Sequence, residues 1–81
     1  MTLKTIPLSE LEIGKSGIIS EVNLQGAFKR RLSELGLLRG VQINARRAAP
    51  LGDPIAYTIK GYQLSLRKKD TQHILINIRE F

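Results

Sequence analysis

Apolar and polar residues alternate with a period of two along most of this chain. Such alternation is typical of a strand with one buried face, because successive side chains point to opposite sides of a sheet. The pattern predicts five short strands. They span residues 16–22, 41–46, 55–60, 62–67 and 74–79.

The period changes to that of a helix between Ala27 and Leu35. Phe28, Leu32 and Leu35 stand four and then three residues apart, so they line one face of a helix and are expected to be buried. Gly36 follows at the position where a helix often ends in a left-handed residue. The sequence therefore predicts one short helix that docks by a single face.

Three shorter segments separate the predicted elements. Residues 8–12 are expected to form one helical turn, with Ser9 and Glu12 at the spacing of a capping box and Gly14 beyond its end. Residues 49–54 are dense in proline and glycine and predict a turn. Residues 68–71 predict a polar turn or a single turn of 3₁₀ helix.

Five strands with one apolar face each would leave that face open to water in a flat sheet. Rolling the sheet into a barrel buries the face and removes most free edges. The order of elements favours a mostly β fold, a small five-stranded SH3-like barrel with a short helix inserted after the first strand. A five-stranded OB-type barrel fits less well, because its helix usually comes between the third and fourth strands. The length predicts a single domain over residues 1–81.

The chain contains no cysteine, which excludes disulfides, thiolate metal sites and cysteine nucleophiles. A small secreted domain usually needs such cross-links, so the composition favours a reducing cytosol. No apolar run approaches the roughly 18–20 residues that span a bilayer, and the amino-terminal residues lack a signal-peptide core. These features predict a cytoplasmic protein.

The net charge of +6 is concentrated in one central stretch, residues 29–47, which alone carries a net charge of +5. A basic surface of this kind attracts nucleic acid, anionic lipid or an acidic protein. The alternative is a solvated basic face that only aids solubility. The stretch has one acidic residue, Glu34, and the following cations: Lys29, Arg30, Arg31, Arg39, Arg46 and Arg47.

The sequence offers little for catalysis or for a cofactor. His73 is the only histidine, and Asp70 is the one nearby group that could act with it. One imidazole and one carboxylate fall short of the three or four protein ligands of a usual metal site, which leaves open only a metal shared between two chains. The glycines fit no phosphate-binding loop. We therefore expect no enzyme activity, no cofactor and no metal site within one chain.

Two neighbouring leucines, Leu37 and Leu38, follow the predicted helix directly. One is expected to plug the end of the barrel and the other to be an exposed apolar contact, with the choice between them open. A nucleic-acid-binding barrel would interleave its cations with aromatic side chains, and only Phe28 lies near, on the expected core face. The candidate partner-binding residues are Lys29, Arg30, Leu37, Leu38, Arg39, Arg46 and Arg47.

Three motifs occur together in a specific order. They are RLSELGLLRG at residues 31–40, APLGDPI at residues 49–55 and LSLRKKD at residues 64–70. In these motifs the chain resembles the FeoA family of ferrous iron transport proteins. It departs from the common family pattern at Arg39, where a proline is frequent, and at Thr71, where an alanine is frequent.

This resemblance implies an SH3-like barrel and a function. Proteins of the family are cytosolic accessories of FeoB, a membrane permease for ferrous iron with a GTP-binding domain. The chain is thus expected to be non-catalytic, to dock on such a permease at the inner face of the membrane, and to modulate its activity or assembly. The alternative is a nucleic-acid-binding SH3-like module that uses the basic residues.

Overall fold

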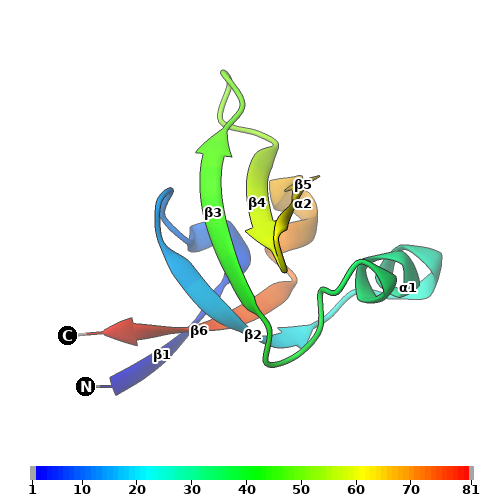
Figure 1. The fold of residues 1–81 in the computed structure, drawn as a ribbon, viewed down its shortest axis with the longest axis horizontal. Helices are drawn as coiled ribbons and strands as arrows, with labels where there is room; N and C mark the ends of the chain where they lie inside the picture. The colour runs from blue at the N-terminus through cyan, green and yellow to red at the C-terminus, as the bar shows by residue number, and fades with distance from the viewer. Residues whose placement is uncertain (1, 81) are drawn as a thin grey trace.

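The structure is a computed structural model that describes residues 2–80. It consists of one strongly curved antiparallel sheet of six strands, in the spatial order β1-β6-β2-β3-β4-β5 (Figure 1). The strands are β1 (Thr2–Pro7), β2 (Ser16–Val22), β3 (Gln42–Ala48), β4 (Ile55–Ile59), β5 (Tyr62–Leu66) and β6 (Ile74–Glu80). Three short helices join them: the 3₁₀ helix η1 (Leu8–Glu10), α1 (Gly26–Glu34) and α2 (Lys68–Thr71).

The five predicted strands and the predicted helix are all present, and the mostly β barrel class is confirmed. The prediction missed β1, so the sheet has six strands and the helix follows the second strand instead of the first. β1 pairs along its whole length with β6, Thr2 opposite Glu80 and Pro7 opposite Leu75. The sequence of β1 gives little indication of a strand, because Leu3 is 70% exposed and the strand has no apolar face along its length.

Two bulges bend the sheet. One lies in β2 between Ile19 and Glu21, where β2 pairs with β6, and the other in β3 between Ala45 and Arg47, where β3 pairs with β4. A bulge bends its strand and increases the local twist. β2 pairs with β3 near its beginning and with β6 near its end, and this carries the sheet around the core.

The expected capping box at Ser9 and Glu12 is wrong. The helical turn is a 3₁₀ turn over Leu8–Glu10 with Pro7 at its N-cap and no side-chain cap. Leu8 is fully buried, so core packing of this leucine accounts for the position of the turn better than capping does. The polar turn at residues 68–71 forms α2, whose last residue, Thr71, is completely buried.

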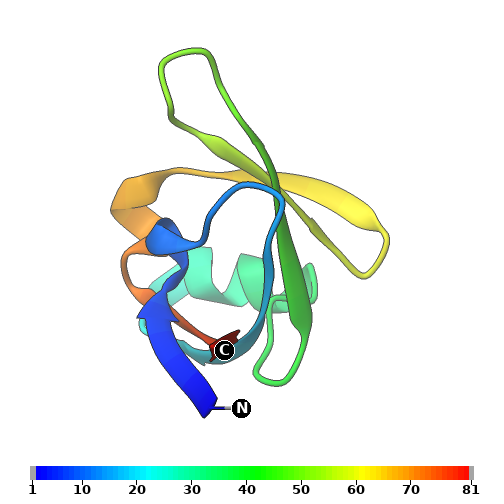
Figure 2. The ribbon, with the colours of Figure 1, turned by 90° about the vertical axis from the view of Figure 1, so that its left-hand side faces the viewer.

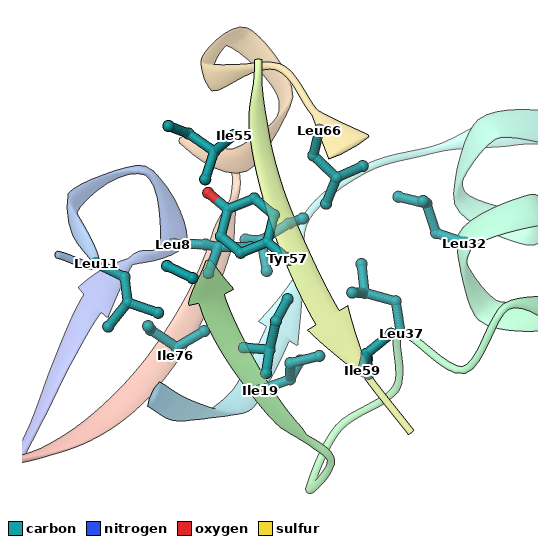
Figure 3. Close-up of a cluster of buried hydrophobic side chains, with 13 residues drawn as sticks. Leu8, Leu11, Ile19, Leu32, Leu37, Ile55, Tyr57, Ile59, Leu66 and Ile76 are labelled. Atoms are coloured by element: carbon teal, nitrogen blue, oxygen red, sulfur yellow. The ribbon is translucent and has the colours of Figure 1, made fainter. Parts of the chain in front are cut away.

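The core lies inside the curve of the sheet and is almost entirely aliphatic; within residues 2–80, Tyr57 is its one buried aromatic side chain (Figure 3). The inward residues of β4, Ile55, Tyr57 and Ile59, are buried, as the period-two pattern predicts. Figure 3 shows Leu32 from α1 and Leu37 from the segment after it closing the core at the side of Ile59.

The prediction for the buried face of α1 is only partly right. Leu32 is buried, but Phe28 is 40% exposed and Leu35 is half-buried. Figure 1 shows the reason, since α1 extends to one side of the barrel. The helix meets the core near Leu32, while its first turn projects beyond the core.

Candidate partner-binding site

The two leucines after α1 have opposite environments. Leu37 is only 1% exposed, and its backbone N–H donates a hydrogen bond to the carbonyl oxygen of Leu32 at 2.9 Å. Leu38 is 46% exposed. Leu37 is therefore the plug of the barrel end, and Leu38 is the apolar side chain available to a partner.

Leu38 lies in a surface cleft of about 550 Å³ between β2 and the segment around α1. Lys29 and Arg39, two of the predicted cations, line the same cleft. We call this surface the helix cleft. Its lining residues are Ser20, Glu21, Val22, Asn23, Lys29, Ser33, Leu37, Leu38 and Arg39.

The sequence reasoning did not identify the β2 side of the helix cleft. Glu21 contributes its one carboxylate, which accepts a hydrogen bond from the side-chain amide of Asn23 at 3.3 Å. The alternating pattern of residues 16–22 predicts which side chains face the core. It does not predict that the outer face of the strand lies beside Leu38. The cleft thus combines an exposed leucine, two cations and one carboxylate.

Gly36 holds the segment that carries Leu38 close to the β4–β5 turn. Its φ of +101° lies in the left-handed region, and a Cβ there would stand 3.2 Å from the hydroxyl of Tyr62 and 3.3 Å from Cδ of Lys60. A glycine lets the chain turn sharply at this close approach. The helix end is thereby packed against β4–β5, and Leu37 and Leu38 are directed to opposite sides.

The structure divides the seven predicted partner-binding residues between two separate parts of the surface. Arg30 lies on α1 and is exposed, near the helix cleft in sequence but not part of its lining. Arg46 and Arg47 lie in the last part of β3, at the bulge. Figure 1 shows that end of β3, with its hairpin, at the top of the molecule and α1 at the right, apart from each other. The stretch from 29 to 47 is continuous in sequence but not one patch in space.

A buried polar pair lies beneath α2. Tyr57 and Thr71 share a side-chain hydrogen bond, and both residues are almost completely buried. Burial raises the pKa of Tyr57 above its usual 10.0, the bond to Thr71 opposes that change, and the nearby charge of Asp53 adds to it. The sequence placed Thr71 in a polar turn and did not predict its burial; its hydroxyl lies 3.5 Å from the carbonyl oxygen of Lys68, to which it donates.

Potential metal ligands are scattered over the described part of the chain. Among residues 2–80, no three His, Asp or Glu side chains gather where they could hold a metal ion. His73 and Asp70 are linked by a backbone hydrogen bond of 3.0 Å, from the His73 N–H to the Asp70 carbonyl oxygen, as expected at the end of a helical turn. In the same part of the chain, no helix is long and apolar enough to cross a membrane.

Comparison with known proteins identifies the family. The sequence model of the FeoA domain matches residues 6–78. The chain belongs to the FeoA family. Among relatives of this FeoA domain is a fusion of Fe(2+) transport protein A with the Fe(2+) transporter FeoB from Porphyromonas gingivalis, 38% identical over 71 residues. Those residues are 88% of this chain but 8% of the fusion protein, so the chain corresponds to a small part of that relative.

Solved FeoA structures share the fold. The FeoA protein of Chlorobium tepidum is 38% identical and superposes with a TM-score of 0.86, over 90% of this chain and 70% of that one. Stenotrophomonas maltophilia FeoA, solved in complex with zinc and described as a prokaryotic SH3 domain protein, is 27% identical, with a TM-score of 0.74, over 85% of this chain and 86% of that one. These similarities confirm both the predicted family and the SH3-like barrel for this FeoA domain.

Proposed function

We propose that this chain is a non-catalytic accessory of ferrous iron uptake that docks on the cytosolic region of a FeoB-type permease and modulates its activity or assembly. The observation that carries the proposal is the Porphyromonas gingivalis fusion, in which a sequence similar to this chain is joined covalently to an Fe(2+) transporter. Domains joined in one protein and separate in another commonly act on each other.

The helix cleft is the docking surface that we assign to this function. Interfaces draw most of their affinity from a few apolar or aromatic anchors, surrounded by polar groups that exclude water. Leu38 is such an anchor, because it is exposed on a segment fixed by the buried Leu37. Lys29 and Arg39 flank it and would steer an acidic partner surface toward the cleft, chiefly by raising the association rate.

Uptake of radioactive ferrous iron tests the proposal in cells. A strain of the source organism that lacks its own copy of this chain would be complemented with the wild type, with Leu38→Ser or with Leu3→Ser. Leu3 is a matched control, because it is 70% exposed on β1 and does not line the helix cleft. We expect uptake to be restored by the wild type and Leu3→Ser but not by Leu38→Ser, at equal protein levels. Full uptake without the chain would overturn the proposal.

A further inference from the structure

The hairpin between β3 and β4 carries a fully exposed leucine at its tip. Leu51 is 98% exposed, and the hairpin projects from the barrel in both views (Figures 1 and 2). Two backbone hydrogen bonds define the turn, from Gly52 N–H to the Ala49 carbonyl oxygen at 2.7 Å and from Ala49 N–H to the Pro54 carbonyl oxygen at 2.9 Å. Leu51 is thus held away from the core by an ordered turn.

Five exposed cations surround the base of this hairpin. Arg46 and Arg47 stand at its β3 side, and Arg67, Lys68 and Lys69 stand at the beginning of α2. The Asp53 carboxylate accepts a hydrogen bond from the Lys68 N–H at 3.0 Å, which fixes α2 against the hairpin.

The sheet register brings the two groups of cations together. Arg47 lies opposite Ala56, and Ala56 lies opposite Ser65, two residues before Arg67. Together with Asp53 and Asp70, the five cations give this end of the molecule a net charge of +3. We call the exposed set the tip cluster, and it consists of Arg46, Arg47, Leu51, Arg67, Lys68 and Lys69.

We propose that the tip cluster binds the surface of an anionic membrane, with Leu51 entering the boundary between headgroups and acyl chains and the cations contacting lipid phosphates. Peripheral proteins bind such surfaces through an apolar insertion combined with attraction to anionic lipids. Each Lys or Arg near the surface contributes about fivefold to the partition coefficient. An aliphatic side chain on a narrow, projecting turn needs no shaped pocket in order to be buried in lipid.

The other acidic partners fit this end of the molecule less well. Single-stranded nucleic acid is held by aromatic side chains that stack on bases. Of the tyrosines, Tyr57 is buried and Tyr62 lies at the far end of β5 from Arg67, while Phe28 lies on α1. A protein partner would be recognised through a compact apolar patch, and here Leu51 stands alone between Pro50 and Gly52.

The membrane proposal is independent of the helix cleft. The hairpin projects from the top of the barrel and α1 extends to its right, so the two surfaces do not overlap (Figure 1). Failure of membrane binding would leave docking on the permease untouched, and the reverse also holds.

Vesicle flotation with the full chain tests the proposal. The vesicles are phosphatidylcholine alone or phosphatidylcholine with phosphatidylglycerol, at low and high salt. We expect binding only to the anionic vesicles, weakened by salt.

The double variant Arg46→Gln/Arg47→Gln should lower the partition coefficient about 25-fold, the product of two fivefold effects. Leu51→Ser should lower it by about tenfold, since a buried aliphatic side chain is lost. Neither change touches a buried residue, so the fold is retained.

Two matched control variants distinguish binding through the tip cluster from attraction that is due only to the overall positive charge of the protein. Lys29→Gln/Arg30→Gln removes the same charge from α1, and Leu3→Ser removes an exposed leucine from β1. Both should bind vesicles as the wild type does. Equal losses from the α1 pair and the β3 pair would overturn the tip cluster as the membrane-binding site.

A fluorescent reporter measures insertion directly, because the chain has no tryptophan of its own. The emission of Leu51→Trp should shift to shorter wavelength when phosphatidylglycerol vesicles are added, and that of Leu3→Trp should not. No shift for Leu51→Trp, or tighter binding of the same tip residues to a DNA oligonucleotide than to vesicles, would contradict the proposal.

Discussion

The carboxylate of Asp53 accepts a hydrogen bond from the backbone N–H of Lys68 at 3.0 Å, across 15 residues of sequence. One side chain thereby satisfies a free amide at the beginning of α2 and ties that helix to the β3–β4 hairpin. It also lies close enough to Tyr57 for its charge to raise the pKa of the phenol. Asp53 thus connects the hairpin, α2 and the core.

The first prediction follows from this bond. Asp53→Ala should lower the free energy of unfolding by about 1 kcal/mol, since the amide of Lys68 loses its acceptor. Hydrogen exchange at the Lys68 amide should become faster at the same time. Urea denaturation and exchange measured by NMR check both effects. Glu12→Ala removes the same charge from an exposed residue and serves as the control. An unchanged Lys68 exchange rate in Asp53→Ala would show that the bond contributes nothing.

The second prediction uses the two adjacent leucines. Leu37→Ala should destabilise the protein by about 2–4 kcal/mol, because it leaves a cavity at the end of the core. Leu38→Ala should cost less than about 1 kcal/mol, since its side chain is already 46% exposed. Chemical denaturation of the two variants gives the comparison. Equal costs would mean that the barrel end is not closed by Leu37 alone.

The third prediction concerns the contact at Gly36. Both Gly36→Ala and Gly40→Ala place a side chain at a positive φ, +101° and +88°, and each should cost about 1–2 kcal/mol. Only Gly36 has neighbours for the new Cβ, the Tyr62 hydroxyl at 3.2 Å and Lys60 Cδ at 3.3 Å. Gly36→Ala should therefore cost about 0.5–1 kcal/mol more than Gly40→Ala, as these side chains must shift.

A second-site change tests the source of that extra cost. Tyr62→Phe removes the hydroxyl and should recover part of the difference in the Gly36→Ala background. If Tyr62→Phe recovers no stability, contact between the new Cβ and the Tyr62 hydroxyl is not the source of the extra cost.

The fourth prediction is a pH dependence at Tyr57. Burial raises its pKa, so the folded protein holds the phenolic proton more tightly than the unfolded chain does. The resulting stabilisation is complete below the ordinary value of 10.0 and is lost as the pH rises from there through the folded-state pKa. Urea denaturation at a series of alkaline pH values should show this loss in the wild type and a smaller one in Tyr57→Phe. Tyr62→Phe is the control, and equal slopes for all three proteins would contradict the expectation.

The strands β2 to β6 were predicted well because the side chains on their inward faces pack in the core. This burial shows in the sequence as an alternation of apolar and polar residues. β1 was missed because its pairing with β6 comes from backbone hydrogen bonds, which leave no apolar pattern in Thr2–Pro7. Phe28 was misassigned because helical spacing defines a face but not how far the helix extends beyond the core. The burial of Thr71 was not predicted, because its side chain meets Tyr57, which lies 14 residues earlier and on another element.

The candidate site was predicted only in part. The sequence marked Leu37 and Leu38 as a pair with one exposed member, but the choice depends on the turn at Gly36 and its packing against Tyr62. It also grouped Arg46 and Arg47 with Lys29 and Arg30 because they are close along the chain. The direction of β3 carries the later pair away from α1, and a sequence pattern does not encode that direction.

The central claim, that the helix cleft docks on the permease, is tested most directly by the dissociation rate from the purified cytosolic region of the FeoB-type permease of the same organism. Surface plasmon resonance would compare the wild type with Leu38→Ser and with Leu51→Ser, the same change on the remote hairpin tip. We predict dissociation at least about tenfold faster for Leu38→Ser, because an interface anchor is lost. Leu51→Ser should dissociate as the wild type does. Wild-type kinetics for Leu38→Ser, or an equal effect of the two changes, would contradict the account.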